Sequence, residues 1–339
     1  MQVPADPGLM FQYFVNRGWS DGLPMLPPTR AAIAEMIAVS GLEKEQVLGV
    51  IPPLNGIATM EKVAANAVMA GCLPDYFPLV VAAVKGVLQP GFNLDGVQTT
   101  TGNVAPLVII NGPCRNTLQI NYSSNVLGQG WRANATIGRA LRLVLSNIGG
   151  ATPGLYDKAT LGQPAKYTFC IAENEEENPW EPLHVERGFA RDSSAVTVVG
   201  ALGTWNMNIH AKDSGDLLRV IADTMTFPAS SDFVYAGEPW LILSPEHAHI
   251  LHRDGLAKAE VKRRLWEQAR LAAHRLSAKD FGRTQSGRRA DLGEITRDTL
   301  LTIASQPGNI GILVAGGPGT HSVYVPMSGH VRSVTRQIV

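Results

Sequence analysis

Polar side chains that could do chemistry gather after a short apolar run at residues 167–172. Cys170 lies inside this run, Glu173 follows it directly, and His184 comes later in the same loop. A thiol, a carboxyl and an imidazole are groups that nucleophilic and acid–base catalysis commonly use. We therefore take Cys170, Glu173 and His184 as candidate catalytic residues.

Two of these residues also have simpler explanations. A cysteine in an apolar strand is usually a small core residue, and it becomes a nucleophile only where a nearby cation or base favours the thiolate. Lys166 or one of the histidines could supply that neighbour through the fold. Glu173 differs from the acids at 175–177, because burial at a strand end would raise its pKa towards acid–base use. The later acids are typical of a solvated surface.

His184 is followed by Glu186 and Arg187, which leaves two interpretations open. In an extended segment His184 and Glu186 would share one side, as a base does with the carboxylate that orients it. The alternative is an ion cluster on the surface that includes Arg187. The residues alone do not decide between the two.

A candidate substrate cradle lies at the start of the helical run 131–147. Arg132 and Asn134 follow a glycine-rich turn there. Free backbone N–H groups and a guanidinium at a helix start favour a carboxylate or a phosphate. Alternatively, Arg132 pairs with a nearby acid. The full set of predicted substrate-binding residues is Arg132, Asn134, Lys166, His210 and Ser322.

The loop at 316–322 follows another strand-like run and ends with His321 and Ser322. It lacks the GK[ST] of a P-loop and does not fit GxGxxG, so nucleotide binding has no support. We expect His321 to face Cys170 and Glu173 as a further catalytic residue.

Residues 247–252 hold the densest cluster of histidines. On a helix, residues 247 and 249 point to different sides, so a metal site with three ligands is not expected there. A metal-dependent enzyme that uses His210, His321 and acids is a third hypothesis. Otherwise we expect neither a metal nor an organic cofactor.

The elements that must position these residues alternate between strand-like and helix-like runs. Apolar strands separated by helical runs are typical of an α/β fold with mainly parallel sheets. The pattern at 106–110 recurs at 239–243, and the strand ending at 170 has a counterpart ending near 313. These matches predict an internal duplication, with chance similarity between two α/β units as the alternative.

We therefore expect three regions: an N-terminal loop and helix at 1–41, a first α/β half at 42–192, and a similar second half at 193–339. In α/β folds ligands collect beyond the carboxyl ends of strands, and often between two such halves. The site is accordingly expected between the halves.

The composition excludes several classes of protein. The 339 residues carry 29 basic and 29 acidic side chains, so no basic field exists to hold a nucleic acid. Three cysteines without a CxxC spacing argue against a disulfide framework and against a zinc ribbon. The sequence has neither a secretory signal nor an apolar run that could span a bilayer. We expect a cytoplasmic protein without membrane partners, and its low charged fraction of 17% favours a homo-oligomer.

One N-terminal segment resembles a known family. It reads W-x-D-G-L-P-x-x-P-P-T and consists of Trp19, Asp21, Gly22, Leu23, Pro24, Pro27, Pro28 and Thr29. It resembles the signature of a group of bacterial proteins called UGSC-like, after a selenocysteine/Cys-Gly-Ser-Cys motif. The resemblance implies a bacterial, cytoplasmic, catabolic enzyme, but the redox motif itself is absent, so no thiol-redox role carries over. From the residues alone, the segment predicts a rigid loop leading into a helix capped by Thr29.

These observations lead to two hypotheses of different kinds. The first is an enzyme, a hydrolase or lyase, that acts on a small carboxylated metabolite by acid–base or cysteine chemistry. The alternative is a non-catalytic or thiol-redox-related binding subunit of a larger bacterial complex. In both, the ligand is held between the two halves.

Overall fold

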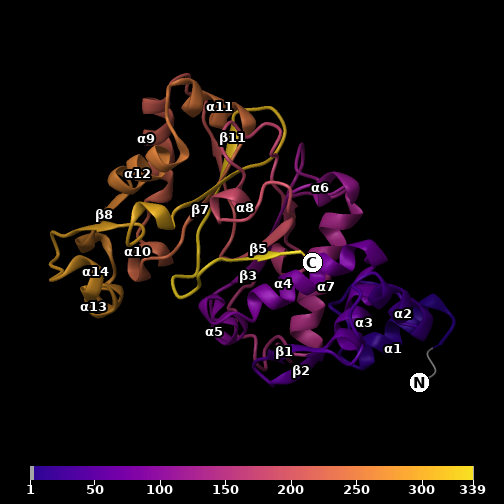
Figure 1. Cartoon of the computed structure of the whole chain (residues 1–339). Helices are drawn as coiled ribbons and strands as arrows, with labels where there is room; N and C mark the ends of the chain where they lie inside the picture. Colours follow the sequence, from indigo (N-terminus) through magenta and orange to yellow (C-terminus); the bar gives the residue numbers. More distant parts are fainter. Residues whose placement is uncertain (1–3, 339) are drawn as a thin grey trace.

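The computed structural model describes residues 4–338, which form an α/β fold with two four-stranded mixed sheets. The N-terminal helices and the first sheet make up one side of the molecule (Figure 1). The second sheet and its helices make up the other side. Polar loops follow strands of both sheets, and several of the residues predicted to form the site lie in these loops.

The first sheet has the strand order β12–β5–β3–β4. Its strands are β3 (Ala105–Asn111), β4 (Cys170–Ala172), β5 (Ala195–Ala201) and β12 (Val334–Gln337). β3 and β4 are parallel, whereas β5 runs antiparallel to β3, and β12 runs antiparallel to β5. Every residue of β3, β4 and β5 is buried, which explains why these runs are apolar throughout.

The second sheet has the strand order β10–β7–β11–β6. Its strands are β6 (Trp205–Asn208), β7 (Trp240–Leu243), β10 (Gly311–Val314) and β11 (His321–Val325). β7 and β10 are parallel, β11 runs antiparallel to β7, and β6 runs antiparallel to β11. Counted from β4 in the first sheet and from β10 in the second, each sheet therefore has two parallel strands, then a strand antiparallel to them, then a strand antiparallel to that one.

The fourth strand of each sheet comes from the other part of the chain. β6 follows β5 in sequence but pairs in the second sheet, and β12 follows β11 but pairs in the first. The two crossing segments touch each other. Leu202 N–H donates to the Pro326 carbonyl at 2.8 Å, and Ala201 forms a β-bridge with Met327. The two sheets are thus joined by exchanged strands.

Two expectations from the sequence change here. Mainly parallel sheets are not confirmed, since within residues 4–338 each four-stranded sheet holds one parallel and two antiparallel pairs. The boundary expected after residue 192 also separates β5 from β3, although the two pair along their whole length. Buried strands of either direction are uniformly apolar, so their direction could not be read from hydrophobicity.

Eight α-helices precede β5 in the described chain, and they pack around the first sheet and the N-terminal segment. They are α1 (Pro7–Asn16), α2 (Arg30–Ala38), α3 (Met60–Ala70), α4 (Phe77–Val87), α5 (Leu94–Thr99), α6 (Cys114–Thr117), α7 (Arg132–Asn147) and α8 (Leu183–Glu186), beside a hairpin of β1 (Val47–Ile51) and β2 (Gly56–Thr59). The Thr29 side chain accepts the Ala32 N–H at 3.2 Å, which confirms the predicted cap of α2. α3 packs on α7, and α4 packs on β5.

Helices of the second part surround its own hydrophobic core. They are α9 (Ser214–Met225), α10 (Ser231–Tyr235), α11 (Pro245–Arg253), α12 (Lys258–Gln268), α13 (Ala278–Gly287) and α14 (Arg289–Leu292), with a small ribbon of β8 (Arg270–Ala272) and β9 (Leu300–Thr302). The Ser244 side chain caps α11 by accepting the His247 N–H at 3.3 Å. Residues 247–252 are helical, as the sequence predicts.

The helix α7 confirms the helical run expected at 131–147, and its two sides differ in burial. Ile137, Leu141 and Val144 lie on one stripe and are fully or almost fully buried. Arg139 and Arg142 lie on another side and remain half-buried. Because one turn of helix separates the two arginines, they reach neighbouring points on the same surface.

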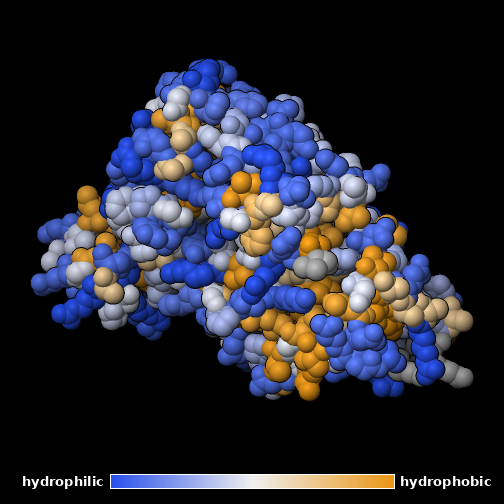
Figure 2. Space-filling model, in the orientation of Figure 1, coloured by the Kyte–Doolittle hydropathy of each residue, from blue (hydrophilic) through white to orange (hydrophobic). Residues whose placement is uncertain are grey.

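An apolar patch covers the β1–β2 hairpin. Val47, Val50, Leu54 and Ile57 keep between 50% and 56% of their surface exposed. Figure 2 shows hydrophobic residues gathered over this hairpin, at the bottom of the view. Val50 and Ile57 are direct cross-strand partners, so their side chains form one continuous apolar surface.

No single helix among residues 4–338 is long and apolar enough to cross a membrane. One bent pair of helical segments, 74–87 with 90–99, meets the length and composition criteria jointly, with a 75° bend between its two members. Most residues of α4, which lies in this pair, are buried inside the protein.

Candidate functional site

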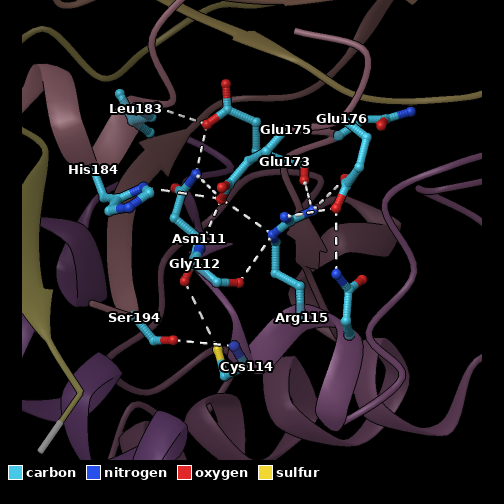
Figure 3. A network of polar contacts seen from close by, with 12 residues as sticks. Asn111, Gly112, Cys114, Arg115, Glu173, Glu175, Glu176, Leu183, His184 and Ser194 are labelled. Carbon is cyan, nitrogen blue, oxygen red and sulfur yellow. Dashed lines mark hydrogen bonds and ion pairs between the residues drawn. The ribbon is translucent and has the colours of Figure 1, made fainter. Parts of the chain in front are cut away.

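Glu173 is completely buried where β3 and β4 end (Figure 3). The parallel register sets Ile110 opposite Ala172, so the residues that follow, Asn111 and Glu173, come side by side. The Glu173 carboxylate accepts three N–H groups, from Asn111 Nδ2 at 2.5 Å, Leu183 N at 2.7 Å and Asn178 Nδ2 at 2.8 Å. Burial raises the pKa of Glu173, and the charge of Lys258 acts against this rise.

Arg115 joins the next two acids to the same strand ends. Its side chain is only 4% exposed, and its Nε lies 3.1 Å from Glu175 Oε1. Its two terminal nitrogens donate to the Glu176 carboxylate at 3.0 and 3.1 Å. Glu175 Oε1 also accepts the Gly112 N–H at 2.7 Å. Glu175 is therefore half-buried within a network, which sequence reasoning missed when it assigned all the later acids to the surface.

His184 lies in the short helix α8 and is fully buried beside this network. Its Nδ1 lies 3.9 Å from Glu175 Oε1 and has no hydrogen-bond partner within the described chain. Neither interpretation of the His184–Arg187 segment holds. Glu186 pairs with Lys258 at 3.0 Å and with Lys262, and these contacts join α8 to α12.

The loop after β4 also closes the gap between the two sheets. Asn174 N–H donates to the Val314 carbonyl at 2.7 Å, at the end of β10. Gly316 N–H donates to the Tyr122 carbonyl at 2.9 Å. The carboxylates of the network are occupied by protein donors, and the strand ends beside them are held by backbone hydrogen bonds. The network therefore holds the loop 173–187 in place on both sheets.

The cysteine chemistry expected at Cys170 finds no support in its surroundings. Cys170 is 6% exposed on β4, and burial raises the pKa of its thiol far above the usual value. Asn134 is buried next to it and donates to the Cys170 carbonyl at 3.2 Å and to the Asn121 carbonyl at 2.9 Å. Asn134 thus links α7 to the backbone and is not free for a substrate.

The predicted residues of the C-terminal part lie on the second sheet. His321 is exposed, and its partner within residues 4–338 is Asn206 at 3.2 Å, not Glu173 or Cys170. Ser322 is buried, and its hydroxyl lies between the Ser244 N–H at 3.0 Å and His247 Nδ1 at 2.6 Å. His210 is exposed after β6.

A cavity of about 760 Å³ opens elsewhere, between the N-terminal segment and α7. Its wall consists of residues 18–21, four side chains of α7, and the loop 151–167. Among the nine predicted site residues, Lys166 alone lines this cavity within the described chain. Apolar side chains such as Trp19 and Leu143 share the lining with a few polar and charged groups, which is typical of small-molecule sites.

Arg142 lines the cavity from α7. Its guanidinium makes no hydrogen bond or ion pair with any of residues 4–338 that the structure describes. Burial lowers the pKa of Arg142, and the charge of Asp157 acts in the opposite direction. Because arginine stays protonated in proteins, the cavity wall holds a positive charge without a partner.

Lys166 and Asp157 form an ion pair in the same cavity. Lys166 Nζ lies 2.8 Å from Asp157 Oδ1 and 2.6 Å from Oδ2. The two side chains are 17% and 14% exposed, so the pair is largely removed from water. Burial lowers the pKa of Lys166, Asp157 raises it, and the charge of Arg142 adds to the lowering.

The beginning of the segment that resembles the UGSC-like signature, with Trp19 and Asp21, lines the cavity. Asp21 binds Arg139 of α7 through two hydrogen bonds of 2.7 and 2.8 Å. Asn147 Nδ2 donates to the Trp19 carbonyl at 3.1 Å. Gly22 adopts a φ of 91°, a conformation that glycine reaches without strain, so that the chain can turn directly after Asp21.

The last predicted residue, Arg132, does not line the cavity. It is exposed at the start of α7, and its Nε donates to the Gly71 carbonyl at 3.0 Å. Across residues 4–338 no group of three or more His, Cys, Asp and Glu side chains is arranged to hold a metal ion.

Comparisons with known proteins leave the site to be interpreted from its geometry. A scan against protein families finds no match, and a search of curated proteins finds no similar sequence.

Sequence reasoning missed Arg142 and Asp157 as site residues. A usable signal for Arg142 was its place one turn after Arg139, opposite the apolar stripe of α7. Asp157 gave no such signal, because its meeting with Lys166 depends on how the irregular loop 151–167 folds.

Proposed function

We propose that this chain is an enzyme that binds a small carboxylated metabolite in the cavity beside α7. The observation that carries the proposal is the unpartnered guanidinium of Arg142 in the cavity wall. Arg142 is half-buried and keeps its charge on the cavity wall. A carboxylate offers two oxygens that match the planar fork of a guanidinium. The cavity is large enough for such a molecule, since ligand sites commonly measure about 300–1,000 Å³.

The Lys166–Asp157 pair supplies acid–base chemistry next to this anchor. A lysine whose pKa is lowered by burial can give up its proton more easily than one in water, and Asp157 can receive it. A base beside an anchored carboxylate favours a lyase or hydrolase type of reaction. Acid–base chemistry of this kind needs no thiol.

The thiol-redox alternative has less support. Burial raises the pKa of Cys114 and Cys170, and it raises the pKa of Cys72 to about 12. Reactive cysteines instead have lowered pKa values and are accessible. A non-catalytic subunit that only binds a ligand would use the same cavity, and a search for turnover of the bound carboxylate separates it from the enzyme.

Binding can be tested with a panel of mono- and dicarboxylates in thermal-shift and calorimetric titrations. We expect binding by the wild type and by Arg132→Gln, which removes an exposed arginine of the same helix. We expect no binding by Arg142→Gln. The proposal fails if no carboxylate of the panel binds, or if Arg142→Gln binds as tightly as the wild type.

Three further proposals concern the whole chain. The shared succession of strand directions in the two sheets supports an internal duplication in which the last strands have been exchanged. The apolar hairpin surface at β1–β2 supports a homo-oligomer. A UGSC-like relationship is a third proposal, and its support is that two residues of the signature, Trp19 and Asp21, line the cavity.

A further inference from the structure

We infer that the metabolite carries a ketone as well as its carboxylate, and that Lys166 Nζ forms an imine with that ketone. This inference rests on the proposed carboxylate site and deepens it. It names the substrate class, oxo acids, and it gives Lys166 a covalent role.

The position of Lys166 is the first reason. Its side chain lines the same cavity as Arg142, the anchor for the carboxylate. Because both cations line one cavity, a single small molecule bound there can meet both. The charge of Arg142 also adds to the lowering of the Lys166 pKa. A second cation next to a desolvated lysine is an arrangement that favours the neutral, nucleophilic amine.

The contact with Asp157 is the second reason. Imine formation needs a group that takes protons from nitrogen and gives them to oxygen, and Asp157 lies within 2.8 Å of Lys166 Nζ through both carboxylate oxygens. Asp157 Oδ1 also accepts the Ala159 N–H at 3.1 Å, which fixes its orientation.

The chemical steps balance without an oxidant or a reductant. The lone pair of Lys166 Nζ attacks the ketone carbon, the C–N bond forms, and the electrons of the C=O bond move to oxygen, which takes up a proton. The proton that the oxygen takes up is the one that the Lys166 ammonium first gave to Asp157 when it became a neutral amine. Asp157 then removes a second proton from nitrogen and passes it to the hydroxyl group, which leaves as water, while nitrogen keeps its last proton in the iminium. The resulting iminium draws electrons from a neighbouring bond, as decarboxylation and retro-aldol cleavage require.

Lys158 offers a matched control on the same loop. It is exposed, does not line the cavity, and donates to the Gly154 carbonyl at 2.7 Å. If lysines of this loop reacted without selection, Lys158 would react more than Lys166 because water reaches it freely.

The test uses the full-length protein with pyruvate, acetoacetate and succinate as separate probes. Each mixture is treated with cyanoborohydride, which reduces an imine to a stable amine, and the adduct is located by peptide mass spectrometry. We expect one adduct on Lys166 with at least one oxo acid, none with succinate, and an unchanged adduct in Lys158→Arg. Lys166→Arg keeps the charge next to Asp157, and it should abolish the adduct while succinate still binds.

The outcomes separate this inference from the proposed function. If carboxylates bind through Arg142 but neither oxo acid gives an adduct on Lys166, the imine is wrong and the binding site stands. Equal labelling of Lys158 and Lys166 also overturns the imine. If none of the three probes binds or reacts, the inference fails together with the proposed site for these ligands.

Discussion

Asp21 and Arg139 form a two-bonded ion pair that fastens the N-terminal segment to α7. The same guanidinium donates to the carbonyls of Leu23 and Pro24 at 3.2 and 3.0 Å. One arginine of α7 is thus fully used to build the wall of the cavity. The next, Arg142, is the residue that we propose binds the carboxylate of a ligand.

Asp21→Asn should destabilise the protein by about 2–3 kcal/mol, since it leaves the largely buried Arg139 without its counter-ion. Urea unfolding at neutral pH measures this change. Glu35→Gln, an exposed acid on α2, serves as the control and should change the free energy of unfolding very little. An equal loss of stability in both variants would contradict the role of the pair.

Arg115→Met should cost about 3–5 kcal/mol in unfolding free energy, because it leaves Glu175 half-buried without its partner. The matched control is Arg264→Met, which breaks a partly exposed pair with Glu260 and should cost less than about 1 kcal/mol. Chemical denaturation compares the two. If the two variants lost similar amounts of unfolding free energy, the contacts of Arg115 would not be what fixes the loop 173–187.

Asp232→Asn should stabilise the protein more at pH 8 than at pH 4. Asp232 is fully buried against the Tyr324 hydroxyl at 2.7 Å, and burial raises its pKa from 3.8 to about 7. Between these values the folded chain binds the proton more tightly than the unfolded chain, so stability falls as pH rises through the window. The full loss amounts to at most about 4 kcal/mol.

Melting temperatures of the wild type and Asp232→Asn at both pH values measure this difference. The exposed substitution Asp216→Asn controls for the general effect of removing an acid. A constant gap between wild type and Asp232→Asn at pH 4 and pH 8 would mean that Asp232 does not titrate in this range.

Val50→Lys combined with Ile57→Glu should reduce the oligomer to a 36.3 kDa monomer. The opposite charges keep a favourable cross-strand pair in the hairpin while removing its apolar surface. Light scattering after size exclusion gives the mass. Leu300→Lys, an exposed position on β9, should leave the wild-type mass unchanged. A monomeric wild type would refute the proposal of an oligomer.

Local patterns in the sequence predicted much of the fold. The apolar stripe of Ile137, Leu141 and Val144 predicted α7, and Thr29 predicted the start of α2. The direction of β5 could not be predicted, because a strand buried on both faces reads alike whether it is parallel or antiparallel.

The candidate site was harder to predict than the fold. Lys166 was selected for its charge, but its partner Asp157 and its neighbour Arg142 reach it only through the fold of an irregular loop and a helix. Cys170 was predicted to be catalytic and Asn134 to bind substrate, yet both are buried by tertiary packing that residue types do not reveal.

The exchange of β6 and β12 has a consequence for how the molecule could be divided. A chain cut between β6 and β7 would produce two pieces, each with three strands of one sheet and the missing edge of the other. Neither piece could complete a sheet by itself, but mixed together each would supply the strand that the other lacks. The two pieces should therefore reassemble by complementation, as interlocked parts rather than as independent domains.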